Sequence, residues 1–239
     1  MRLARRILTP LFVLIAVYLG VLCKPQPLFA WSVTSQNLTL YSDRPFNPSA
    51  GAHVLELVRG KLAASPLYGG EHHNIFICSA PWRRVLLFNR NYRVGGVSYA
   101  SLTNNVFLRD AIVEDNRLLD SRGKPVAADR PLDYFIAHEV THAMTGRALG
   151  LVDYARLPEW VREGYADYVG KGRAFDYDAA ARMYRNGAPE MDRWKSGLYL
   201  RYHLLVAYEL DKQHWTVQRL LGSRRAQAAV EREIETAIQ

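Results

Sequence analysis

Cysteine is scarce in this chain. Only Cys23 and Cys78 occur among its 239 residues, and Cys23 lies in an apolar N-terminal stretch. A scaffold held together by several disulfides is therefore excluded. Cys78 ends the apolar run that starts at Ile75, where we expect it to behave as a small buried hydrophobic residue.

Internal repeats, low-complexity segments and a Pro/Gly-rich linker are also missing from the sequence. The chain is 49% hydrophobic and 23% charged, and 239 residues suffice for one substantial core but not for two full-sized domains. The sequence therefore predicts one folded domain with an N-terminal extension.

A strong excess of basic charge is lacking once that extension is set aside. The formal charge is +8, but four of the 31 basic residues lie within the first 30 positions. Residues 31–239 then carry 27 basic and 23 acidic side chains, a surplus of +4. Such a balance gives little support to a nucleic-acid partner.

The first 30 residues predict an export segment, either a cleaved signal peptide or an N-terminal membrane anchor. Three arginines precede the apolar stretch Ile7 to Cys23, which is followed by Lys24 and two prolines. This stretch is long for a cleaved signal and barely long enough to span a bilayer. We favour an uncleaved anchor that is not part of the fold, with residues 31–239 outside the cytoplasm. Cleavage after Ala30 would instead give a secreted or periplasmic protein.

The remaining chain changes from short strands to helices. A strand is expected within 31–40 and a helix over 49–64, followed by short strands at 74–78, 84–88, 96–99 and 105–108. From Pro131 onward, helices are expected over 131–148, 158–169, 177–186, 195–212 and 215–237, the last one broken near Gly222. A small mixed sheet followed by a mainly helical half is an α+β arrangement.

The segment from His138 to His142 reads His-Glu-Val-Thr-His and falls inside a predicted helix. Residues four apart on a helix share a face, so both imidazoles can reach one cation. Catalytic zinc sites use three protein ligands, and a third ligand should follow. Glu163, on the next predicted helix, is our choice.

Asp167 lies one turn beyond Glu163, where its carboxylate is expected to accept the second N–H of a zinc-bound histidine. The small residues Gly164 and Ala166 suggest that this helix packs closely against the helix that carries the histidines. The adjacent residues His72 and His73 would point to opposite faces of a strand, which disfavours a joint metal site.

The pattern His-Glu-x-x-His followed by Trp-x-x-Glu-Gly-x-Ala resembles the gluzincin branch of the zincin metallopeptidases, a peptidase MA-like family. The matching residues are His138, Glu139, His142, Trp160, Glu163, Gly164 and Ala166. The resemblance covers about residues 131–170. The sequence shows neither the Gly-Ala-Met-Glu-Asn motif of the related aminopeptidases nor their large accessory domains, so specificity for a free amino terminus is not carried over.

The resemblance implies a zincin fold, one Zn²⁺ ion, and a peptide or protein substrate that pairs with an edge strand, either 96–99 or 105–108. Glu139, which is not a ligand, would act as general base toward water. We expect the activity to be that of an endopeptidase. A tyrosine or histidine on a later helix would stabilise the oxyanion. Tyr199 is our choice over Tyr202 and His203.

Two other functions stay open at this point. One is a catalytically silent zincin-like scaffold that binds a partner protein, although such a scaffold has no need of Glu139. The other is a small-substrate metal amidase that takes its third ligand from a cysteine, for which Cys78 is the only candidate outside the N-terminal segment.

Overall fold

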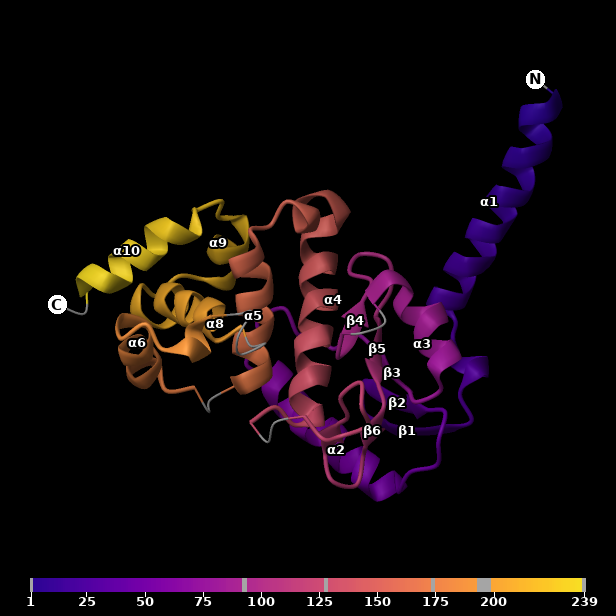
Figure 1. Ribbon diagram of the computed structural model, residues 1–239, viewed down its shortest axis with the longest axis horizontal. Coiled ribbons are helices and arrows are strands. Elements are labelled where there is room, and N and C mark those ends of the chain that lie inside the picture. Colours follow the sequence, from indigo (N-terminus) through magenta and orange to yellow (C-terminus); the bar gives the residue numbers. More distant parts are fainter. Residues whose placement is uncertain (1, 92–93, 127–128, 173–174, 193–198, 238–239) are drawn as a thin grey trace.

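The computed structural model describes residues 2–91, 94–126, 129–172, 175–192 and 199–237. A small mixed sheet forms one side of the body, and a group of helices forms the other (Figure 1). The long helix α4 (Leu132–Ala155) runs between them. The predicted α+β class is confirmed.

The main sheet has five strands in the order β1-β2-β3-β5-β4. These are β1 (Trp31–Ser35), β2 (Leu38–Ser42), β3 (His73–Cys78), β5 (Asn105–Arg109) and β4 (Gly96–Ser98). The three central strands are parallel, and β1 and β4 pair antiparallel at the two edges. Of the two segments considered for an edge strand, 96–99 and 105–108, the first is at an edge, as β4. The second, β5, lies between β3 and β4. A separate two-stranded sheet joins β6 (Ala111–Ile112) to β7 (Arg117–Leu118).

Most predicted helices are confirmed within a few residues. Three helices precede β4 in the chain: α1 (Arg2–Cys23), α2 (Pro48–Leu62) and α3 (Pro81–Phe88). Five described helices follow α4: α5 (Glu159–Lys171), α6 (Tyr177–Arg185), α8 (Leu200–Ala207), α9 (Val217–Gly222) and α10 (Gln227–Ala237). A π-helical turn, Tyr208–Lys212, extends α8, and short 3-10 turns lie at Gln26–Leu28, Asn89–Asn91 and Pro189–Met191. Residues 195–198 of the predicted helix 195–212 lie outside the described residues.

The strand expected within 31–40 is present as β1, and β2 forms a hairpin with it through a turn in which Gln36 has a φ of 52°. The strand predicted at 84–88 is wrong. The segment 84–88 lies within α3, which begins with Pro81 at its first position. Proline is favoured at a helix start because its missing N–H would have no partner there. A short apolar run such as 85–88 has no period that separates a strand from a buried helical turn.

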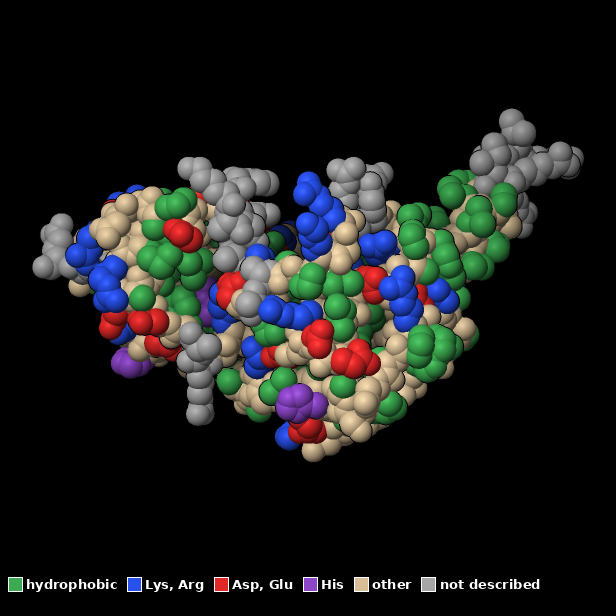
Figure 2. Space-filling view, turned by 60° about the horizontal axis from the view of Figure 1, so that its bottom comes forward, with side chains coloured by type: hydrophobic (Ala, Val, Ile, Leu, Met, Phe, Trp, Pro, Cys, Tyr) green, Lys and Arg blue, Asp and Glu red, His purple; other side chains and the backbone are tan. Residues whose placement is uncertain are grey.

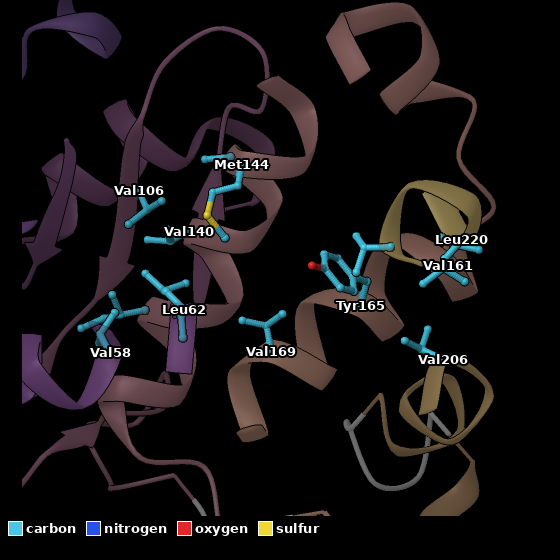
Figure 3. Packing of buried hydrophobic residues seen from close by; sticks show 14 of the residues in the cluster. Val58, Leu62, Val106, Val140, Met144, Val161, Tyr165, Val169, Val206 and Leu220 are labelled. Carbon is cyan, nitrogen blue, oxygen red and sulfur yellow. The ribbon is translucent and has the colours of Figure 1, made fainter. Parts of the chain in front are cut away.

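Helix α4 is buried on nearly all sides from Leu132 to Gly146. Figure 3 shows Val140 and Met144 of α4 lying toward Val106 of β5 and Leu62 of α2, with α5 on the opposite flank. A helix enclosed by a sheet and by other helices carries apolar residues around its whole circumference. The polar residues that remain on α4 are therefore held in a dry and rigid setting.

We expected Gly164 to let α5 pack closely against α4, but Gly164 lies against α8 instead. A Cβ at Gly164 would lie 2.5 Å from the Tyr202 carbonyl oxygen, so Gly164 permits the contact of α5 with α8. Gly170 faces α4 instead, where a Cβ would lie 3.1 Å from the Tyr134 ring.

The last turns of the N-terminal segment belong to the folded body, contrary to our expectation. Leu22 and Phe29 are buried in a second core cluster on the sheet face away from α4, with Phe76 and Phe107. The Asn105 side-chain amide donates a hydrogen bond of 2.8 Å to the Leu22 carbonyl. Residues 22–29 thus cover part of the sheet that would otherwise be open.

The rest of α1 projects from the body (Figure 1), and hydrophobic side chains are exposed along its residues 8–19 (Figure 2). Phe12 is 72% exposed and Leu14 is 66% exposed. Among the described residues, no helix reaches the length and apolar character needed to cross a bilayer.

Candidate metal centre

The two histidines of the motif project from one face of α4, as their spacing predicts. His138 and His142 are both buried, and their Nε2 atoms lie 3.2 Å apart. The rings meet edge to face with centroids 4.8 Å apart. Each of the two imidazole rings therefore directs its Nε2 atom toward one shared point.

Glu163 of α5 supplies a third donor at that point. Its Oε2 lies 3.3 Å from His142 Nε2 and 3.6 Å from His138 Nε2. Its other oxygen, Oε1, accepts a hydrogen bond of 3.1 Å from Arg162 Nε. Among the described residues, these three form the one group of histidine, cysteine or acidic side chains placed to hold a metal.

The electrostatics of the site keep Glu163 ionised. Burial alone would raise the pKa of Glu163, but the charge of His142 and hydrogen bonds from both histidines outweigh burial and lower that pKa well below its usual range. An ionised carboxylate beside two imidazoles is the donor set that zinc prefers.

The distances among the three donors fit a tetrahedral zinc ion. Ligand atoms at about 2.0–2.1 Å from such an ion lie about 3.4 Å from one another. The measured separations of 3.2, 3.3 and 3.6 Å bracket this value. The three side chains are therefore spaced as the ligands of such an ion would be.

Glu139 lies beside the donors but is not one of them. Burial raises the pKa of its carboxyl to about 7, and a hydrogen bond from Ser98 of β4 opposes this shift. A Cβ at Gly96 would lie 2.8 Å from Glu139 Cγ. Glycine at this position of β4 therefore makes room for the Glu139 side chain between the edge strand and α4.

A cleft of about 700 Å³ gives access to this group. Its walls come from β4, the segment that follows β7, the first half of α5 and α4, where Tyr154 of the last turn contributes as well as the first half. Both Glu139 and Tyr199 line it. The cleft thus brings a potential base and the donor set to one solvent-accessible space bounded by a sheet edge.

The three candidates for oxyanion stabilisation are placed differently. Tyr199 lines the cleft, and its ring stacks on His138 with centroids 5.7 Å apart. His203 is fully buried, and its Nδ1 lies 2.8 Å from Asp167 Oδ2. Tyr202 stacks on Tyr199 with centroids 6.1 Å apart. Of the three, Tyr199 is the residue that faces the cleft.

Asp167 does not accept a hydrogen bond from His138 or His142, as its position one turn after Glu163 had suggested. Its two oxygens bond to His203 Nδ1 and to the Tyr134 hydroxyl, and all three side chains are buried. Burial would raise the pKa of Asp167, but the hydrogen bond and charge of His203 lower it overall. Asp167 therefore ties α5 to α4 and α8 behind the donor set.

Two tyrosines near the site were not predicted. Tyr134 lies four residues before His138, so helical spacing alone could have placed it on the same face of α4. The Tyr154 hydroxyl lies 3.1 Å from His142 Nδ1. Tyr154 follows a break in α4 at Gly150, and no periodicity in the sequence predicts that approach.

The other histidines and Cys78 lie apart from the donors. Burial lowers the pKa of His73 to about 4, and the neighbouring His72 Nε2 lies 3.0 Å from Thr39 Oγ1. Cys78 is fully buried in the second core cluster, as predicted, on the sheet face away from α4. Burial raises the pKa of its thiol above the ordinary range.

Comparisons with known protein families, with curated proteins and with solved structures find no match to this chain.

Proposed function

We propose that this protein is a zinc metallopeptidase of the zincin type, which hydrolyses peptide bonds within extended substrates. The observation that carries the proposal is the set of three donor separations at His138, His142 and Glu163, which match the edges of a tetrahedral zinc site. The position of α4 beneath a small mixed sheet supports a zincin fold.

Zinc held by these donors would lower the pKa of water and polarise the substrate carbonyl. Glu139 lies in the same cleft and would accept a proton from the attacking water at its carboxylate. It would then deliver this proton to the leaving amine. The Tyr199 hydroxyl would donate a hydrogen bond to the oxygen that gains negative charge.

The edge strand β4 supports an extended peptide as the substrate. β4 pairs with β5 on one side only, so its outer backbone groups face the cleft side of the sheet. An extended chain added there would use main-chain hydrogen bonds and lie across Glu139. This arrangement favours cleavage within a chain.

A direct test measures zinc content and peptide hydrolysis of the purified full-length protein. We expect about one zinc per chain and cleavage of a mixed library of unstructured peptides. A chelator should stop cleavage, and added Zn²⁺ should restore it. Stoichiometric zinc without cleavage of any peptide would favour the silent binding scaffold instead.

The metal amidase alternative requires Cys78 as the third ligand. Cys78 lies on the sheet face away from α4, whereas Glu163 lies within 3.6 Å of both histidines. Formylated amino acids should therefore be poor substrates compared with longer peptides, which the same assay measures.

We also propose that residues 1–30 direct export and stay attached to the catalytic domain. Leu22 and Phe29 fill the second core cluster, so cleavage after Ala30 would open that cluster to water. The intact mass of the mature protein, isolated from membranes and from the soluble fraction outside the cytoplasm, should include these residues.

The same packing predicts a difference in stability along α1. Leu22→Ala should lower the free energy of unfolding by about 2–5 kcal/mol because it leaves a cavity in the core. Leu14→Ala, on the exposed part of the helix, should change it by less than about 0.5 kcal/mol. Urea denaturation of both variants measures the contrast, and equal effects would show that residue 22 is not buried.

A further inference from the structure

Tyr154 reaches the metal centre because α4 breaks near its end. Gly150 has a φ of 74°, a left-handed conformation that glycine adopts without strain, and the chain turns there before its last helical turn. The Tyr154 ring meets the His142 ring edge to face, with centroids 6.4 Å apart. Its hydroxyl lies 3.1 Å from His142 Nδ1.

The tautomer of His142 follows from the geometry of its two nitrogens. Nε2 faces the shared point, 3.2 Å from His138 Nε2 and 3.3 Å from Glu163 Oε2. A neutral imidazole that gives its Nε2 lone pair to a cation must carry its proton on Nδ1. The His142 Nδ1–H would then donate to the Tyr154 hydroxyl oxygen.

Among the described residues, no other hydrogen bond to an Nδ1 atom of His138 or His142 is present. His138 Nδ1 is buried and has no hydrogen-bond partner among the residues that the structure describes. Asp167 bonds to Tyr134 and His203. The hydroxyl of Tyr154 is thus the described hydrogen-bond partner that can orient a ligand imidazole.

We propose that Tyr154 is a positioning residue that holds His142 in its metal-binding tautomer and orientation, a role that sequence spacing suggested for Asp167. The inference rests on the proposed zinc site. Outer-shell partners of this kind contribute about 10–100-fold to metal affinity.

The test compares Tyr154→Phe with wild type and with Tyr184→Phe. Tyr184 lies on α6, its hydroxyl bonds to Glu235 of α10, and it is not among the residues that line the cleft. We expect Tyr154→Phe to raise the Kd for Zn²⁺ by about 10-fold or more. It should also change the visible absorption spectrum of the Co²⁺-substituted protein. Tyr184→Phe should change neither.

Thermal unfolding of the metal-free variants separates positioning from general stability. Tyr154→Phe keeps the ring, so its metal-free Tm should stay close to that of wild type. An unchanged zinc Kd and Co²⁺ spectrum, even with a lower kcat, would overturn the inference because Tyr154 would then act on substrate. Failure of wild type itself to bind zinc would instead reject the proposed function.

If Tyr154→Phe does not fold, nitrogen NMR of zinc-loaded wild type gives an independent answer. We expect the His142 proton on Nδ1, with a slowly exchanging, hydrogen-bonded N–H signal. A His142 protonated on Nε2 and coordinated through Nδ1 would contradict it.

Discussion

Glu139→Gln is expected to lower kcat for peptide hydrolysis by about 10²–10⁴-fold and to leave the zinc content unchanged. General acid–base groups contribute about this factor, and an amide cannot accept the proton that a carboxylate accepts. Glutamine has nearly the same shape, so the close contact at Gly96 is preserved. Glu139 is not among the three donors, and the metal should therefore stay.

The measurement pairs steady-state kinetics with metal analysis of the same preparation. Glu190→Gln, an exposed glutamate in the 3-10 turn Pro189–Met191, is the matched control and should retain full activity. Wild-type rates in Glu139→Gln would reject Glu139 as the base. Loss of zinc along with activity would mean that Glu139 supports the metal site and not only the proton transfer.

Glu163→Ala is expected to weaken zinc binding by more than the about 10–100-fold typical of outer-shell changes, because it removes a donor atom. The two remaining imidazoles lie 3.2 Å apart and offer only two corners of a tetrahedron. The variant should be isolated largely without zinc and should be inactive at ordinary zinc concentrations.

Glu159→Ala provides the matched control for this variant. Glu159 lies one turn earlier on α5 and lines the same cleft, but it is outside the metal-binding group. Competition with a chromophoric chelator gives both affinities. Should Glu163→Ala bind zinc as tightly as Glu159→Ala, the third ligand must come from elsewhere and the proposed centre is incorrect.

The wrong strand prediction falls where the local pattern is short. The run Val85 to Phe88 has too few residues to display a helical or strand period, and Pro81 at the helix start was the stronger signal. The strand expected within 31–40 is present as β1, but its hairpin partner β2 was not predicted, because Gln36 and Asn37 are not a strong turn pair. Longer segments such as α2, α4 and α5 were located well because several turns repeat one pattern.

Which helices approach each other closely could not be predicted from a local sequence pattern either. Gly164 was recognised as a contact residue, but its partner is α8 and not α4. A small residue indicates that something packs closely at that position. It does not identify the neighbour, because the neighbour depends on how distant helices are arranged.

What the sequence alone determined is the pairing of His138 with His142 and the adjacent Glu139, because a helix of 3.6 residues per turn places these side chains without help from the rest of the chain. Tertiary structure decided that Glu163 lies beside both histidines and that β4 is an edge strand. It also decided that Asp167 bonds to Tyr134 and His203, and that Tyr154 reaches His142. These contacts depend on how separate helices and strands are placed relative to one another, and on the turn at Gly150. The periodicity of a single segment encodes neither the placement nor the turn.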